Sequence, residues 1–138
     1  MPLPPESADL MRAAERASRS AYAPYSRLNV GAAVRSASGA VYAGCNAENA
    51  AFPLGSCAEA NAIGAAVLAE GPALRLVEVA ISAHEADGRA VTIPPCGGCR
   101  QRIGEFGPHA RVHFATEDGG VRTLTLDELL PESFRLEP

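Results

Sequence analysis

The sequence predicts an α/β sandwich built around one central sheet. Segments with helical periodicity alternate along the chain with short runs of small and β-branched residues. No repeat, low-complexity tract or long linker divides the chain. Its 138 residues, 47% of them hydrophobic, are enough to form one core. We therefore expect a single domain over residues 1–138, with helices packed on the sheet.

The N-terminal part of the chain predicts a helix followed by a β-hairpin. Over residues 7–21 the apolar side chains recur on one helical face, and Pro24 ends this pattern. Residues 28–36 are rich in small and branched side chains, which favours a strand. Ser38-Gly39 is a turn signal, so residues 40–45 are expected to form the returning strand.

The rest of the chain repeats the alternation of helix and strand. The expected elements are, in order, an alanine-rich helix over residues 57–70 stopped by Gly71 and Pro72, a buried strand over 74–83, a polar loop over 85–89, a helix over 99–106, two strands over 111–116 and 121–126 around a turn at 118–120, and a short helix from Asp127.

Charge and composition exclude several classes of partner. The formal net charge is -4 and no basic block occurs, which disfavours a polynucleotide partner. No apolar run is long enough to span a bilayer, and the N-terminus does not read as a secretory signal, so we expect no membrane partner and a cytoplasmic location. In that compartment the four cysteines are expected to be reduced or metal-bound rather than paired in disulfides.

Two short motifs carry the chemistry, Cys57-Ala58-Glu59 and Pro95-Cys96-Gly97-Gly98-Cys99. The second pair of cysteines alone is typical of a redox pair or of half a structural zinc site. A further cysteine at another helix start, followed two residues later by glutamate, is the signature of zinc-dependent deaminases. We therefore predict one Zn²⁺ per chain, held by Cys57, Cys96 and Cys99.

A metal with three protein ligands and a nearby glutamate together suit a hydrolytic deamination. Three protein ligands leave one position of the metal open to water, and zinc makes that water a hydroxide nucleophile near neutral pH, able to attack C4 of cytosine. The ring nitrogen N3 must also gain a proton, and the amino group must be protonated before it leaves. We assign both proton transfers to Glu59.

Other interpretations of these residues remain open. A structural zinc site could include Cys45 as a fourth ligand, and such a module would bind a protein partner without catalysis. Cys45 is also consistent with a small buried residue at a strand end, which we favour. Glu59 could be an ordinary acid in the first turn of a helix. That interpretation predicts no particular spacing from a cysteine.

Five segments occur in an order that resembles the small homotetrameric cytidine deaminases. They are AYAPYS (21–26), VGAA (30–33), GCNAENAAFPLGSCAE (44–59), PCGGCRQ (95–101) and ELLPESF (128–134). The resemblance implies a three-layer α/β/α sandwich around a mixed sheet of about five strands. It also implies hydrolysis of cytidine or 2'-deoxycytidine to the uracil nucleoside and ammonia, in pyrimidine salvage, by a homotetramer with shared active sites.

The resemblance also implies the residues that bind the substrate. Asn46 and Glu48 match the pair that hydrogen-bonds the ribose hydroxyls, and the N–H of Ala58 matches a contact to the base carbonyl. Phe134 matches an aromatic residue that packs on the base from a neighbouring subunit. From the residues alone, Glu48 could equally form a loop salt bridge and Asn46 a turn.

Two positions depart from the family pattern. Leu28 stands where a phenylalanine usually packs against the base, and Ala60 stands where an arginine usually hydrogen-bonds the thiolates. Deaminases of blasticidin S, a cytosine nucleoside antibiotic, resemble the chain at the zinc motifs and also lack that arginine. Glu48, however, suits an ordinary ribose.

The absence of that arginine requires another source of positive charge. We expect the backbone N–H groups of Ala58, Gly98 and Cys99 to hydrogen-bond the sulfurs, because the start of a helix presents free N–H groups to anions. The side chain of Asn61 or Arg100 is expected to help offset the charge of the thiolates.

Overall fold

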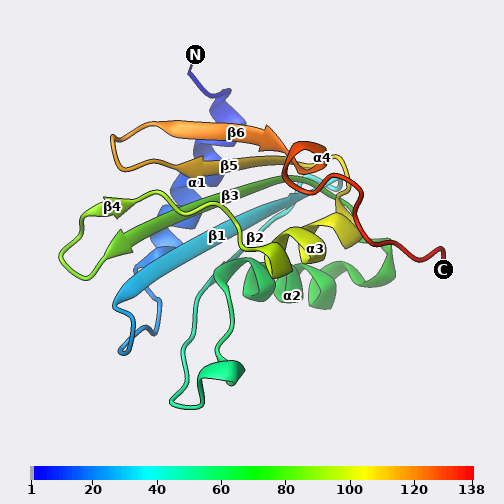
Figure 1. Ribbon diagram of the computed structural model, residues 1–138. Helices are drawn as coiled ribbons and strands as arrows, with labels where there is room; N and C mark the ends of the chain where they lie inside the picture. The colour runs from blue at the N-terminus through cyan, green and yellow to red at the C-terminus, as the bar shows by residue number, and fades with distance from the viewer. Residues whose placement is uncertain (1) are drawn as a thin grey trace.

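The computed structural model describes residues 2–138 and has three layers, with a mixed sheet between helices (Figure 1). The elements are α1 (Pro5–Ser18), β1 (Leu28–Ser36), β2 (Val41–Cys45), η1 (Phe52–Leu54), α2 (Ala58–Glu70), η2 (Gly71–Ala73), β3 (Leu76–Glu85), β4 (Ala90–Val91), α3 (Gly97–Phe106), β5 (Arg111–Ala115), β6 (Val121–Thr125) and α4 (Leu126–Leu129). Helix α1 covers one face of the sheet, and α2 and α3 cover the other. The predicted α/β/α sandwich is confirmed.

The sheet has the strand order β2-β1-β3-β5-β6, and the short strand β4 pairs with β3. All pairs are antiparallel except β3 and β5, which are parallel and are joined by a crossover that contains α3. The expected mixed sheet of about five strands is therefore present, with β4 as an addition. Strand β4 was not expected, because only its two residues pair with the end of β3 across the polar loop at 85–89.

Small side chains on β1 allow helices to pack on both faces of the sheet. Residues 31–34 are buried, and alternate side chains point to opposite faces. Ala32 and Val34 belong to the core that includes α2 and α3, whereas Ala33 packs with residues of α1. A strand that is covered on both faces typically has a continuous apolar sequence, and residues 30–34 of β1 have one.

Two glycines bring helix backbones into direct contact with the strands. A Cβ atom on Gly31 would lie 1.9 Å from the carbonyl oxygen of Ala14 in α1. A Cβ atom on Gly44 would lie 2.4 Å from the backbone nitrogen of Ala62 in α2. Any larger residue at either position would push the helix off the sheet, so these glycines fix how closely α1 and α2 pack.

Several element boundaries differ from the sequence-based expectation. Helix α1 starts at Pro5, two residues early, because proline is tolerated in the first turn, where its missing N–H has no helical partner. Helix α3 starts at Gly97 rather than at residue 99, since Cys96 adopts the extended conformation of an N-cap. Within residues 2–138, no helix combines the length and the apolar character needed to cross a membrane.

Candidate active site

The starts of two helices bring three cysteines together. Cys57 is the N-cap of α2, Cys96 is the N-cap of α3, and Cys99 lies buried in the first turn of α3. Their Sγ atoms all lie within 4.8 Å of one another. The sequence predicts these three residues as metal ligands, and the fold places them in one cluster.

The geometry of this cluster fits zinc. Zn–S bonds of about 2.3 Å in a tetrahedral site hold the sulfur atoms roughly 3.8 Å apart, so a small adjustment of the side chains would complete the site. Among residues 2–138, the group of possible ligands comprises Cys57, Cys96 and Cys99 and does not include Cys45. Three ligands leave the fourth position open, which is typical of a catalytic rather than a structural zinc.

The three thiols differ in acidity. The backbone N–H groups of Cys99 and Gly98, close to the Cys96 sulfur, favour its thiolate and, against the effect of partial burial, lower the pKa of that thiol. Burial first, and then the negative charges of neighbouring groups, raise the pKa of Cys57 and that of Cys99. A bound cation would hold all three sulfurs as thiolates, since binding of a metal releases the protons of its thiol ligands.

Glu59 is buried beside the cysteines, with only 4% of its surface exposed. Burial raises the pKa of its carboxyl above the ordinary value, and the neighbouring Cys99 thiol and the charge of Arg102 partly oppose this effect. A carboxyl group with a raised pKa can take up and release a proton closer to neutral pH. The environment therefore suits the proton-carrying role that the sequence assigns to Glu59.

A cavity of about 300 Å³ opens above this cluster. Ligand sites of roughly 300 Å³ and more are large enough for small molecules. Three of the expected substrate-binding residues line it, together with Glu59. The lining residues are Val30, Asn46, Ala47, Glu48, Phe52, Gly55, Ser56, Cys57, Ala58, Glu59, Ile93, Pro94 and Cys96.

Glu48 and Asn46 are held in place by the backbone around them. Glu48 accepts hydrogen bonds from the backbone N–H of Tyr25 at 3.0 Å and of Ser26 at 3.2 Å, and from the Ser26 hydroxyl. The Ser26 hydroxyl is the main reason why the pKa of Glu48 lies below its ordinary value. Asn46 accepts from the N–H of Val30 and donates to the carbonyl of Leu28, both at 2.9 Å. Each side chain therefore has a fixed direction.

The other two expected substrate contacts lie outside the cavity of their own chain. Leu28 is half-buried at the start of β1 and does not line the cavity. Phe134 is 70% exposed, in the C-terminal segment, where its carbonyl accepts a hydrogen bond from Gln101 at 3.0 Å. One chain alone does not bring Phe134 to the cysteines.

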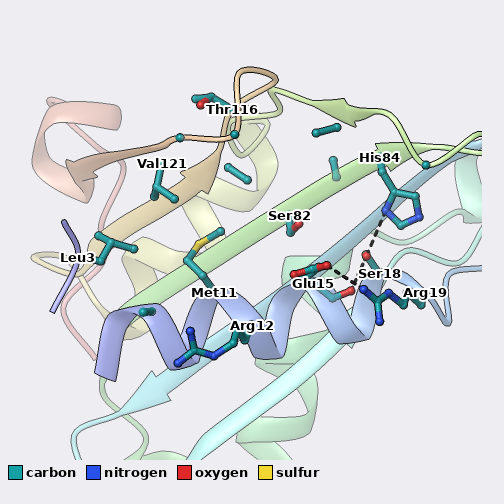
Figure 2. A pocket seen from close by; sticks show the side chains of 17 residues that line it. Leu3, Met11, Arg12, Glu15, Ser18, Arg19, Ser82, His84, Thr116 and Val121 are labelled. Carbon is teal, nitrogen blue, oxygen red and sulfur yellow. Dashed lines mark hydrogen bonds and ion pairs between the residues drawn. The ribbon is translucent and has the colours of Figure 1, made fainter. Parts of the chain in front are cut away.

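A larger cavity of about 530 Å³ lies on the α1 side of the molecule, away from the cysteines (Figure 2). Figure 2 shows His84 pointing toward Ser18 of α1, with 3.3 Å between Nδ1 and Oγ. The Ser18 hydroxyl donates to the carbonyl of Glu15, which itself pairs with Arg19. This cavity is lined by none of the cysteines and not by Glu59, so its size does not make it the candidate active site.

The sequence did not point to Arg102, a residue of α3 close to the cysteines. Arg100 and Asn61, the two side chains expected to support the sulfurs, form hydrogen bonds with other groups. Arg100 donates to the carbonyls of Pro95 and Leu129, both at 2.8 Å, and Asn61 donates to the carbonyl of Cys45 at 2.7 Å. The sequence feature that could have identified Arg102 is its position four residues after Gly98, which places both residues on the same face of the helix.

Known proteins resemble the chain in sequence and in fold. Residues 5–116 match the sequence model of the cytidine and deoxycytidylate deaminase zinc-binding region. The chain belongs to this family. It is 40% identical over 129 residues to a cytidine deaminase of Halalkalibacterium halodurans, with 93% of each chain covered. It is 39% identical over 124 residues to a cytidine deaminase of Mycobacterium tuberculosis, with 90% of this chain and 86% of that one covered.

Solved structures of cytidine deaminases have the same architecture. The chain superimposes on the Burkholderia pseudomallei enzyme with a TM-score of 0.80 at 37% identity, covering 92% of this chain and 98% of that one. The Mycobacterium tuberculosis enzyme gives a TM-score of 0.74 at 35% identity, with 94% and 97% covered. As a family member, the chain thus combines the zinc-deaminase fold with a cysteine cluster able to hold a metal ion.

Proposed function

We propose that this member of the family catalyses the zinc-dependent hydrolysis of cytidine or 2'-deoxycytidine to uridine or 2'-deoxyuridine and ammonia, within pyrimidine salvage. The observation that carries the proposal is the convergence of three cysteine sulfurs and a buried glutamate at a cavity of suitable size. The relatives named cytidine deaminase support it along nearly the whole chain.

The residues of the chain divide the work of the reaction. Cys57, Cys96 and Cys99 would hold zinc, which when bound makes a water acidic enough to act as a nucleophile at neutral pH. Glu59 accepts a proton from the attacking water and delivers it to N3 of the ring. A further proton from the water goes through Glu59 to the amino nitrogen, the C4–N bond breaks, and ammonia leaves as the C4 carbonyl forms.

Other residues that line the cavity are proposed to recognise the nucleoside. Glu48 and Asn46 are proposed to bind the ribose hydroxyls, and the N–H of Ala58 to bind the base carbonyl. Three donors already fix the Glu48 carboxylate, but its oxygens retain lone pairs for a sugar hydroxyl. A site built in this way disfavours free cytosine, because a base without a sugar makes none of these contacts.

The surface of α2 supports the proposed homotetramer. No charged residue occurs between Glu59 and Glu70, and Leu68 is 90% exposed on the outer side of the helix, with Gly64 and Ala65 also exposed. A helix that is apolar on all sides is normally buried, and a second copy of the chain is the occupant that closed symmetric assembly supplies. In such an assembly Phe134 is proposed to reach the cavity of a neighbouring subunit, and Leu28 to line the site with it.

The three cysteines must remain reduced to bind zinc, which suits a cytoplasmic enzyme. The substrate is proposed to be a free nucleoside rather than a polynucleotide, in keeping with the acidic net charge. The whole chain is proposed to act as one catalytic domain.

A substrate panel tests the proposed function. Zinc-loaded protein would be incubated with cytidine, deoxycytidine, cytosine and blasticidin S, and the ultraviolet absorbance change that accompanies loss of the amino group would be followed. We expect rapid turnover of one or both ordinary nucleosides and little turnover of cytosine. Activity confined to blasticidin S would reassign the substrate, and a zinc-loaded protein without any activity would indicate a structural module.

A further inference from the structure

The charge of the proposed zinc site requires a nearby cation. Zinc with three thiolates carries a formal charge of about -1, and Glu59 adds negative charge when it is ionised. The backbone N–H groups of Gly98 and Cys99 favour the thiolate of Cys96. Ala60, the next residue along α2, carries no charge.

The neighbouring polar side chains do not supply this charge. The guanidinium of Arg100 is fixed by the carbonyls of Pro95 and Leu129, where it links the start of α3 to the end of α4. The amide of Asn61 is bound to the carbonyl of Cys45 and to the hydroxyl of Ser56. Both side chains stabilise the loops around the site and are not free to face the sulfurs.

Arg102 is the cation that lies at the cluster. A Cβ atom built on Gly98 would lie 3.2 Å from Nη1 of Arg102 and 3.9 Å from Sγ of Cys96. Nη1 of Arg102 and Sγ of Cys96 are therefore both close to the position that a side chain of residue 98 would occupy, beside the first turn of α3. Within residues 2–138, Arg102 forms no close ion pair with a carboxylate, and its charge acts on Glu59 without direct contact.

The position of Arg102 separates it from the substrate. Arg102 does not line the cavity that contains Glu48 and Glu59. It approaches the cysteines from α3, by way of the space left open at Gly98. A cation in this place can act on the sulfurs without touching a nucleoside in the cavity.

We propose that Arg102 is a positioning residue for the metal centre, which offsets the charge of the thiolates and so strengthens zinc binding. Gly98 has a part in this arrangement, because the missing side chain leaves the space that the guanidinium enters. The inference rests on the proposed zinc site, and it concerns how that site is kept ionised rather than which nucleoside is hydrolysed.

Zinc affinity of the full-length protein, measured by competition with a chromophoric chelator, tests the proposal. Arg102→Met keeps the length of the side chain and removes the charge. We expect its zinc affinity to fall roughly tenfold, as when an outer partner of a metal ligand is lost. Arg102→Lys should restore most of the affinity, and the deficit of Arg102→Met should shrink at high salt. Arg16→Met is the control, because it makes the same change in net charge at an exposed position of α1.

Gly98→Ala provides a second and independent measurement. Its new Cβ would lie 3.2 Å from Nη1 and force the guanidinium to shift slightly, so zinc affinity should fall modestly in the wild-type background. In the Arg102→Met background the same substitution should reduce zinc affinity little further, which a double-mutant cycle would show. Additive losses would overturn the proposal, and so would wild-type zinc affinity in Arg102→Met or an equal loss in Arg16→Met.

These outcomes separate the inference from the proposed function. A protein that binds zinc and hydrolyses cytidine but is unaffected by Arg102→Met retains the proposed function without this role for Arg102. A protein that binds zinc through Arg102 but hydrolyses no cytosine nucleoside retains the role and loses the function.

Discussion

Nε2 of His113 donates a hydrogen bond of 2.7 Å to Oε2 of Glu78, and the two side chains are 2% and 1% exposed. They lie on neighbouring parallel strands, β5 and β3, far from the cysteines in sequence. Ser7 of α1 also donates to the Glu78 carboxylate, and Arg35 lies 3.4 Å from it. The network therefore fastens α1 to the centre of the sheet with charged hydrogen bonds.

Removal of Glu78 should destabilise the fold strongly. Glu78→Ala leaves buried donors without an acceptor, so we expect the free energy of unfolding to fall by about 3 to 5 kcal/mol. Denaturant titration would measure it. Glu105→Ala, on the exposed side of α3, removes the same charge and should change stability by less than about 0.5 kcal/mol. A loss below about 1 kcal/mol in Glu78→Ala would contradict the structural role.

The hydrogen-bond network around Glu78 should make the stability of the fold depend on pH in the acidic range. Burial alone would raise the pKa of Glu78, but hydrogen bonds from Ser7 and His113 and the nearby charges outweigh it, so its pKa lies below the ordinary value. The ionised form thus stabilises the fold above the ordinary value of about 4.3, and this contribution is lost as pH falls through the lowered pKa. The stability difference between wild type and Glu78→Gln should shrink in that acidic range.

Zinc content should depend on three of the four cysteines. Cys96→Ala removes a ligand at the start of α3, and we expect less than one zinc per chain after gel filtration, measured by atomic emission. Cys45→Ala is the matched control, because Cys45 lies outside the cluster, and it should retain full zinc. Loss of zinc in Cys45→Ala would point to a four-cysteine structural site.

Glu59→Gln should separate metal binding from catalysis. The amide fills the same buried space but cannot carry a proton, so turnover should fall by roughly two to four orders of magnitude while zinc is retained. Rates per bound zinc would be compared with those of wild type. Near-normal turnover in the zinc-loaded variant would remove Glu59 from the mechanism.

Glu48→Gln should weaken nucleoside hydrolysis. The loss of a charged acceptor for a sugar hydroxyl corresponds to roughly a ten- to hundredfold drop in kcat/KM for cytidine. Ser26→Ala removes one of the donors to Glu48 and should give a smaller drop in the same direction. Unchanged kcat/KM in Glu48→Gln would show that the sugar binds elsewhere.

Leu68→Glu should break the assembly. A charge on the outer face of α2 would have to be buried between subunits, so sedimentation should show smaller species with reduced activity. Ser20→Glu adds the same charge after α1 and should leave the assembly intact. Wild-type sedimentation of Leu68→Glu would mean that α2 is not an interface.

The sequence is most informative where local patterns decide the structure. Strand β1 has the predicted bounds of residues 28–36, since its small and branched side chains are continuous. The motif spacing indicates which cysteines gather, because both motifs open helices. The parallel pairing of β3 with β5, and hence the contact between Glu78 and His113, depends on a crossover that no local pattern specifies.

The positions of arginine side chains are equally hard to predict. Arg100 and Arg102 stand two residues apart, yet one binds carbonyls of the loop and of α4 while the other faces the cysteines. Long flexible side chains reach several alternative partners, and only the packed fold decides between them. The sequence therefore raised the need for a cation without locating it.

The contact between Gly44 and the backbone of α2 bears on how the metal is captured. A helix that rests on a strand with no side chain between them has few alternative positions, because moving it outward would open a void. The start of α2, with Cys57 and Glu59, is therefore held rigid before any ligand arrives. The entropy of assembling the donor atoms is lost during folding rather than during binding, which is the benefit of preorganisation. Uptake of zinc then requires rotation of a few thiol side chains and no movement of the helices.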